Sequence, residues 1–242
     1  MNNRNDKTGD GQRTYSSDFF EQRRGGSSSS ARAVVPLVTE FITPRSVIDV
    51  GTGTGTWLAV FRELGIDDVW GVDGDYLDRR LLEIPEDRFI ASDLTEPLRV
   101  DRRFDLALSL EVAEHLPPEC GDEFVHTMTR LSSVILFSAA IPFQGGTGHL
   151  NEQWPEYWAA RFEARGYVPV DCIRRRIWRN EDLDWWYAQN LLFYVARDDL
   201  HNHPLLEREY ELMGTSQLSL VHPQKYLHAI EWGLDLQQRL EG

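Results

Sequence analysis

A glycine-rich turn that directly follows a short apolar run constrains this chain more than any other feature. The run 46–50 leads into Asp-Val-Gly-Thr-Gly-Thr-Gly at residues 49–55, and a segment with helical spacing of apolar residues begins at once. Glycine accepts positive φ angles and lets a ligand approach the backbone closely. The N-terminus of the following helix offers free N–H groups to a polar or anionic ligand. We therefore expect a ligand site at residues 51–55.

Apolar runs of strand length alternate with segments of helical spacing along the chain. We expect strands at residues 46–50, 68–72, 88–91, 104–110, 133–139, 167–173 and 191–196. We expect helices at residues 31–41, 56–64, 77–82, 124–131 and 154–162. This alternation predicts an α/β fold, doubly wound, with a mostly parallel sheet covered by helices on both faces. Ligands bind at the carboxyl ends of the strands in such a sheet.

The chain divides into three segments by composition. Residues 1–30 are expected to be a flexible N-terminal segment that can fold over the domain as a lid, with a joint at the Gly/Ser run 25–30. Residues 31–199 hold the alternating strands and helices. Residues 200–242 are expected to form a C-terminal helical extension, whose apolar stripe consists of Leu227, Ile230 and Leu234.

Composition narrows the class of partner and the compartment. A chain of 242 residues suits one α/β domain. Its net charge of -14 makes nucleic acid a poor partner, because phosphate backbones repel it. No apolar run approaches a membrane span, and no secretory signal begins the sequence. Two cysteines without zinc spacing indicate a reduced, cytoplasmic protein, and a homo-oligomer stays open.

Three acidic residues sharpen the identity of the ligand. Asp73 ends the second strand and can accept both hydroxyls of an adenosine ribose. Asp93 follows the third strand and can accept from an adenine amino group while Leu94 covers the ring. Asp49 precedes the first glycine and can meet the ammonium of an amino acid. A nicotinamide dinucleotide fits poorly, because its G-x-G-x-x-G spacing is absent and Asp49 would lie beside the pyrophosphate.

Four motifs together resemble those of class I S-adenosylmethionine-dependent methyltransferases: VIDVGTGTGTW, VWGVDGD, IASDL and FDLALSLEVAEHLP, within residues 45–118. One departure is Thr52, where many relatives carry cysteine. The resemblance implies a Rossmann-like, seven-stranded sheet with an antiparallel last strand. It also implies S-adenosylmethionine as cofactor, bordered by the residues Asp49, Gly51, Thr52, Gly53, Asp73, Gly74, Asp93, Leu94, Ser109 and Glu111.

The segment after the fourth strand bears on the methyl acceptor. Enzymes that methylate the amino groups of nucleobases resemble one another in an Asn/Asp-Pro-Pro-Tyr/Phe sequence there, whereas this chain has Ser-Leu-Glu-Val at 109–112. This difference argues against methylation of a nucleobase or a glutamine. The sequence of residues 111–116 looks like the broad branch that acts on small molecules.

Two histidines at the expected carboxyl edge are candidate catalytic residues. His115 follows the fourth strand and could face the methyl group, or it could bond locally and pack under Leu116. His149 lies in a glycine-rich loop after the fifth strand, where it could act as a base or face the substrate. Methyl transfer to an alcohol needs a proton acceptor, whereas transfer to a carboxylate or phenolate needs little or none.

An arginine run, an aromatic cluster and the N-terminal aromatic residues are candidate substrate contacts. If the sixth strand is parallel, residues 174–179 arrive at the rim of the site, and their guanidinium groups suit an anionic substrate. The alternative is ion pairing with the acids at 181–184. The aromatic cluster at 185–187 could wall a pocket or pack in the core. The candidates are Tyr15, Phe19, Arg174, Arg176, Arg179, Trp186 and Tyr187.

The sequence thus predicts a methyltransferase acting on an oxygen of a small metabolite, and the arginine run adds the hypothesis of an anionic one. One alternative is N-methylation of a small amine, with Glu111 and Asp75 holding the ammonium. Another is a non-catalytic, cofactor-binding partner subunit. No metal site is expected, because the loops after the strands lack a clear cluster of acids suited to magnesium.

Overall fold

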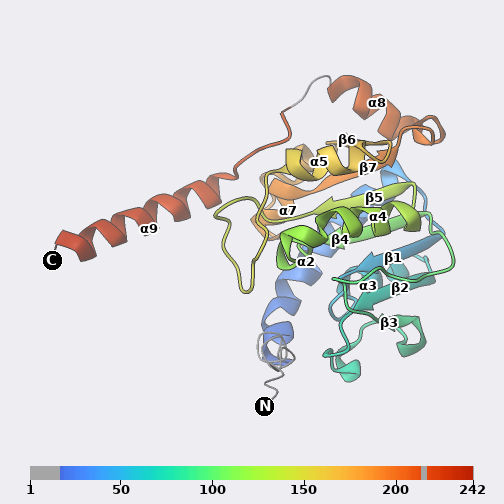
Figure 1. Ribbon diagram of the computed structural model, residues 1–242, viewed down its shortest axis with the longest axis horizontal. Helices are drawn as coiled ribbons and strands as arrows, with labels where there is room; N and C mark the ends of the chain where they lie inside the picture. The colour runs from blue at the N-terminus through green and yellow to red at the C-terminus, as the bar shows by residue number, and fades with distance from the viewer. Residues whose placement is uncertain (1–16, 214–216, 242) are drawn as a thin grey trace, which may run out of the picture.

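A seven-stranded sheet forms the centre of the protein (Figure 1). The computed structural model describes residues 17–213 and 217–241, with side chains from residue 26 to residue 240 over these ranges. The strand order is β3-β2-β1-β4-β5-β7-β6. The strands are β1 (Ser46–Val50), β2 (Asp68–Asp73), β3 (Phe89–Ala91), β4 (Leu106–Leu110), β5 (Val134–Ser138), β6 (Tyr167–Val170) and β7 (Leu192–Ala196).

Only β7 runs against the other strands. β1 pairs in parallel with β2 and with β4, β2 with β3, and β4 with β5. β7 pairs antiparallel with both β5 and β6. The prediction of a Rossmann-like, mostly parallel seven-stranded sheet with an antiparallel last strand is therefore confirmed. Every residue of β1, β4 and β5 is buried, as expected of strands covered on both faces.

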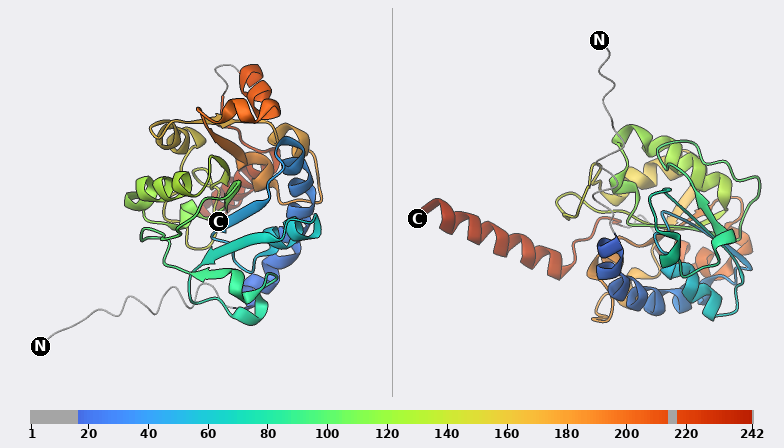
Figure 2. Two further views of the ribbon diagram at one scale, coloured as in Figure 1. Left: turned by 90° about the vertical axis from the view of Figure 1, so that its right-hand side faces the viewer. Right: turned by 90° about the horizontal axis from the view of Figure 1, so that it is seen from below.

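Helices cover both faces of the sheet, and Figure 2 shows α2 and α4 on opposite sides. The α-helices are α2 (Ser17–Phe41), α3 (Thr56–Glu63), α4 (Gly121–Leu131), α5 (Pro155–Glu163), α6 (Arg174–Ile177), α7 (Trp185–Asn190), α8 (Pro204–Met213) and α9 (Pro223–Glu241). Short 3₁₀ turns are η1 (Arg79–Leu81), η2 (Glu86–Arg88), η3 (Ala113–His115), η4 (Pro118–Cys120) and η5 (Leu200–Asn202). Side chains of α2, α3, α6 and α7 share one apolar core, and those of α4 and α5 share the other.

The prediction of a flexible joint at residues 25–30 is wrong, because these residues lie inside the continuous helix α2. Small side chains let the helix pack tightly against the segment before α7. A Cβ atom on Gly26 would lie 2.6 Å from a carboxylate oxygen of Asp184. Ser30 is fully buried, and its hydroxyl accepts a hydrogen bond from the backbone N–H of Asp184. Tertiary contacts thus keep helical a sequence whose local propensity is low.

The sixth strand is shorter than expected, and the arginine run does not extend it. β6 ends at Val170, and residues 174–177 form the short helix α6. The helix expected at 77–82 is only the 3₁₀ turn η1.

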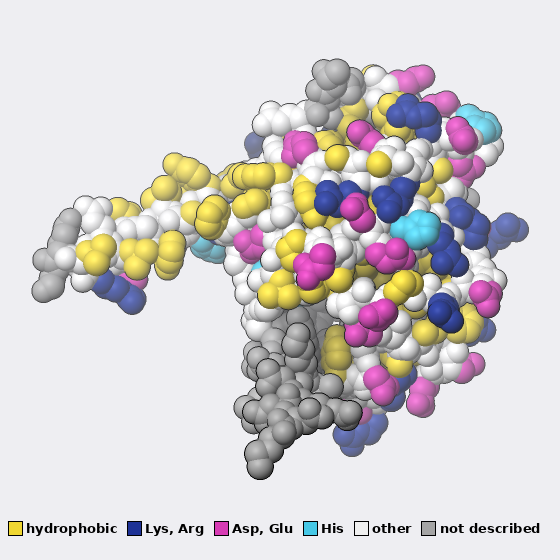
Figure 3. All heavy atoms as spheres, viewed as in Figure 1, with side chains coloured by type: hydrophobic (Ala, Val, Ile, Leu, Met, Phe, Trp, Pro, Cys, Tyr) yellow, Lys and Arg dark blue, Asp and Glu magenta, His cyan; other side chains and the backbone are white. Residues whose placement is uncertain are grey.

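The two C-terminal helices differ in how they contact the domain. α8 packs on β6 and buries Leu206 completely. α9 projects away from the body of the protein (Figure 1), and Figure 3 shows hydrophobic side chains along it. The stripe of Leu227, Ile230 and Leu234 is exposed rather than packed on the sheet. Among the described residues, no helix is long and apolar enough to cross a membrane.

Candidate active site

The glycine loop after β1 adopts a backbone that other residues tolerate poorly. Gly51, Gly53 and Gly55 have φ angles of 86°, 54° and 82°. A Cβ atom on Gly51 would lie 2.3 Å from a methyl carbon of Val112, in the loop after β4. Gly51 therefore lets the ends of β1 and β4 approach each other closely.

Asp73 holds this loop from the end of β2. Its side chain is buried, and one carboxylate oxygen accepts a hydrogen bond of 2.7 Å from the backbone N–H of Gly53. The other oxygen accepts from the N–H of Gly74 at 2.7 Å and from the hydroxyl of Tyr76 at 2.5 Å. Tyr76 was not among the predicted site residues. Its hydroxyl bonds the carboxylate to which the sequence assigned the ribose hydroxyls.

Asp49 is a buried carboxyl at the same edge. It is 2% exposed, and burial raises its pKa to about 7, although the nearby Thr52 side chain opposes the shift. The nearby carboxylate of Asp73 raises the pKa further. A cationic ligand would stabilise the ionised form of Asp49.

These residues fit S-adenosylmethionine. An ammonium group would pair with the buried carboxyl of Asp49, and the glycines keep the backbone of the loop free of side chains. Ser109, at the end of β4, has a fully buried hydroxyl with no hydrogen-bond partner among the described residues. Asp93 is exposed after β3, where its Oδ1 accepts from the N–H and the hydroxyl of Thr95. Leu94 beside it is half-buried.

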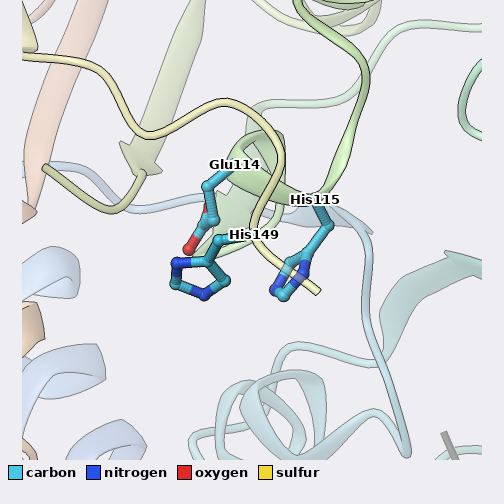
Figure 4. Close-up of side chains that lie close together, drawn as sticks. All are labelled: Glu114, His115 and His149. Atoms are coloured by element: carbon cyan, nitrogen blue, oxygen red, sulfur yellow. The ribbon is translucent and has the colours of Figure 1, made fainter. Parts of the chain in front are cut away.

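A second group of side chains converges one strand away, at the ends of β4 and β5 (Figure 4). Glu114 and His115 lie on η3, and His149 lies in the long loop after β5. The two imidazole rings pack edge to face with centroids 4.8 Å apart. One ligand atom from each of the three residues lies within 4.8 Å of the others. The sequence predicted both histidines as candidates but missed Glu114.

Both imidazoles are oriented through Nδ1. His149 Nδ1 lies 2.8 Å from a carboxylate oxygen of Glu152, and the pair is largely buried. His115 Nδ1 lies 3.3 Å from the carbonyl oxygen of Gly148. The carboxylate of Glu152 also accepts from the backbone N–H groups of Phe143 and Gly145, so it fixes the loop that carries His149.

A network of buried amides surrounds Glu111, which has a positive φ of 56°. Its carboxylate accepts from the side-chain amides of Gln144 at 2.8 Å and Asn190 at 3.0 Å. Burial raises the pKa of Glu111 despite these hydrogen bonds. Burial and the charge of Glu111 raise the pKa of Glu114 well above its usual range. Two interacting carboxyls thus lie beside the loops after β4 and β5. We call this part of the site, around Glu114, His115 and His149, the acceptor side.

The predicted substrate arginines are engaged elsewhere. Arg174 is 1% exposed and donates to the carbonyl oxygens of Gln189 and Leu218 and to the carboxylate of Asp171. The exposed Arg176 pairs with Glu40 on α2. Arg174 and Arg176 therefore form ion pairs, as the alternative interpretation expected, but with Asp171 and Glu40 and not with the acids at 181–184. Arg179 is exposed and lines an open hollow of about 700 Å³ beside α6.

The aromatic candidates belong mostly to the core. Tyr187 is buried, packs edge to face on Trp57 of α3, and has its pKa raised by burial. Trp186 is half-buried against the same apolar cluster. Phe19 lies on α2, but its side chain is outside the described residues, as is the whole of Tyr15.

Comparison with known proteins agrees with this geometry. Residues 20–190 match the family model described as a methyltransferase domain. The match covers more than half of the chain, which therefore belongs to this family, of class I and dependent on S-adenosylmethionine. No curated protein sequence matches the chain.

Several solved structures share the fold. A sugar N-methyltransferase from Streptoalloteichus sp. is 20% identical, with a TM-score of 0.57 over 76% of this chain and 93% of its own. Magnesium protoporphyrin IX methyltransferase from Synechocystis, with bound S-adenosylhomocysteine, is 18% identical, with a TM-score of 0.54 over 73% and 87%. An O-methyltransferase family protein from Burkholderia thailandensis is 16% identical, with a TM-score of 0.52 over 76% and 61%.

If Asp49 binds the ammonium group of the cofactor, its raised pKa should make cofactor binding depend on pH. An ammonium beside Asp49 favours its ionised form, so binding below pH 7 has to release the proton of Asp49. We expect the affinity for S-adenosylhomocysteine to rise by up to about tenfold per pH unit toward pH 7 and then to level off. Isothermal titration between pH 5.5 and 8.5 measures this. The Asp49→Asn variant should bind more weakly and with a flat profile, and a flat wild-type profile would contradict the ammonium role.

Proposed function

We propose that this protein transfers a methyl group from S-adenosylmethionine to a hydroxyl oxygen of a small metabolite. One observation carries the proposal: the Glu114, His115 and His149 cluster lies at the ends of β4 and β5, and His149 is oriented by Glu152. A hydroxyl acceptor needs a group that takes its proton, and a histidine held by a carboxylate suits that role.

The chemistry assigns each group a simple task. Bound S-adenosylmethionine supplies an electrophilic methyl carbon, and the C–S bond breaks as the new C–O bond forms. His149 accepts the hydroxyl proton through Nε2, and Glu152 stabilises the resulting imidazolium through Nδ1. His115 positions the acceptor from the other side of His149. The site therefore works by alignment and proton removal.

The charges around the cluster favour an acceptor that is neutral at its reacting end. The carboxylates of Glu111 and Glu152 lie beside this side of the site and would repel an anion. Arg174 and Arg176 are held by other partners, which weakens the hypothesis of an anionic metabolite. Arg179 stays a candidate contact for a remote anionic group.

N-methylation of a small amine is the second candidate function. The buried carboxyls of Glu111 and Glu114 would attract an ammonium group, and one similar solved structure is named a sugar N-methyltransferase. Asp75 does not support the earlier version of this hypothesis, since it is exposed and pairs with Arg79. An ammonium would still have to lose a proton before attack.

Matched acceptors decide between the two functions. We would incubate the protein with S-adenosylmethionine labelled at the methyl carbon and with pairs of sugars and phenols that differ only in hydroxyl against amine. We expect label in O-methyl products, read by NMR. Label found only in N-methyl products would overturn the proposal. An Asp73→Ala variant is the control, since it should not bind the cofactor well.

We also propose the cytoplasm as the location of this protein. Cys120 and Cys172 are both free thiols, which suits a reducing compartment.

A further inference from the structure

We infer that Glu114, His115 and His149 bind one divalent transition-metal ion at the acceptor side of the site (Figure 4). The role of the ion in methyl transfer rests on the proposed function, whereas its binding does not. Two imidazoles and one carboxylate are a donor set that suits zinc, manganese, iron or cobalt.

Glu114 is the strongest reason for an ion. The residue is fully buried, and neither carboxylate oxygen forms a hydrogen bond of ordinary geometry with the described residues, although the backbone N–H groups of Glu114 and Ala140 lie near the carboxyl. A buried acceptor without a partner costs about 1–3 kcal/mol, and more when it is charged. Within the same described ranges, neither Glu114 nor Glu111 forms an ion pair with a lysine or an arginine. A divalent cation would supply the missing partner.

The two histidines carry the outer contacts that metal-bound histidines usually have. A ligating imidazole commonly donates its other N–H to a carboxylate or a backbone carbonyl, which fixes the ring. His149 makes this contact with Glu152, and His115 makes it with the carbonyl of Gly148. If Nδ1 keeps these contacts when an ion binds, Nε2 of each ring would be the ligand atom.

The donor atoms have to draw slightly closer around an ion. Ligands at about 2.1 Å from a tetrahedral ion lie about 3.4 Å apart, and the present atoms lie within 4.8 Å of one another. This movement would have to come from the loop that carries His149, in which Gly145, Gly146 and Gly148 have positive φ.

A bound ion would change the task of His149 in the proposed reaction. The imidazole would serve as a ligand, and the hydroxyl oxygen of the acceptor would take an open position on the ion. A cation lowers the pKa of a bound hydroxyl, so its proton can pass to water before the oxygen attacks.

Metal titration of the untagged full chain tests the inference. We would add Zn²⁺ and Co²⁺ to chelator-treated protein and follow the heat of binding and the visible Co²⁺ spectrum. We expect one ion per chain and a spectrum typical of nitrogen and oxygen ligands. Glu114→Gln and His149→Ala should each weaken binding by at least about 10–100-fold. His126→Ala is the matched control, because His126 is exposed on α4.

Two results would overturn the inference: no ion binding to the wild-type protein at 100-fold molar excess, or binding that Glu114→Gln and His149→Ala leave unchanged. Circular dichroism checks that the variants fold, and the wild-type Co²⁺ spectrum stands without them. The acceptor assay separates this inference from the proposed function. O-methylation by a chain that binds no ion would refute the metal site alone, and a bound ion with only N-methyl products would refute the proposed function alone.

Discussion

Replacing His149 with alanine should lower kcat for methyl transfer to a hydroxyl by about 10²–10⁴-fold. The imidazole is the member of the cluster that touches both Glu152 and the ring of His115, so its loss removes the group that handles the acceptor proton. The affinity for S-adenosylhomocysteine should stay the same, because the residues that we propose to bind the cofactor lie at the ends of β1 and β2. Steady-state kinetics and isothermal titration measure the two quantities.

A graded series sharpens this test. Glu152→Gln keeps the shape of the side chain but removes its charge, so it should lower kcat less than the alanine variant of His149 does. His126→Ala, on the exposed face of α4, should change neither quantity. Wild-type turnover by His149→Ala would exclude His149 as the base of the reaction.

Of the variants proposed here, Arg174→Ala should lower the free energy of unfolding most. We expect Arg174→Ala to lower the free energy of unfolding by about 3–5 kcal/mol, since removing one member of a buried ion pair leaves the other uncompensated. The guanidinium joins three segments: Asp171 after β6, the carbonyl of Gln189 on α7, and the carbonyl of Leu218 before α9. Urea denaturation measures the change.

Arg175 is the matched control for Arg174. It is exposed and pairs with Glu209 on α8, so Arg175→Ala should cost about 1 kcal/mol or less. At temperatures where Arg174→Ala remains folded, the KM for the acceptor should not change. An unaltered stability together with a raised KM would restore the substrate role that the sequence suggested for Arg174.

Local patterns predicted the fold well because the strands are short, buried and bounded by turn residues. β1 and the glycine loop follow from residues 46–55 alone, since only glycine suits the positive φ angles there. The flexible joint expected at 25–30 was wrong because the conformation of this segment depends on contacts with residues distant in sequence. Gly26 and Ser30 look like a linker in sequence, and only their contacts with Asp184 make them part of α2.

At the acceptor side, too, sequence patterns could not show which residues distant in sequence become neighbours. His115 and His149 were predicted one at a time, from their places after β4 and β5. Glu152 could have been found from its spacing of three residues after His149, and Glu114 from its place beside His115. Their roles could not be predicted, because the burial of Glu114 depends on the loop after β5. The backbone N–H groups of Leu150 and Asn151 in this loop donate hydrogen bonds to the backbone carbonyl of Glu114.

The sequence by itself determined the methyl donor and the sheet. Glycines, Asp49 and Asp73 act through backbone geometry and charge within a short stretch of chain, and such local requirements are visible in residue type and spacing. Only the tertiary structure decided that Arg174 is buried and links three segments through hydrogen bonds, and that Glu114 lies beside two histidines. Those outcomes depend on which segments distant in sequence become neighbours, and burial then sets the cost of every charge placed between them.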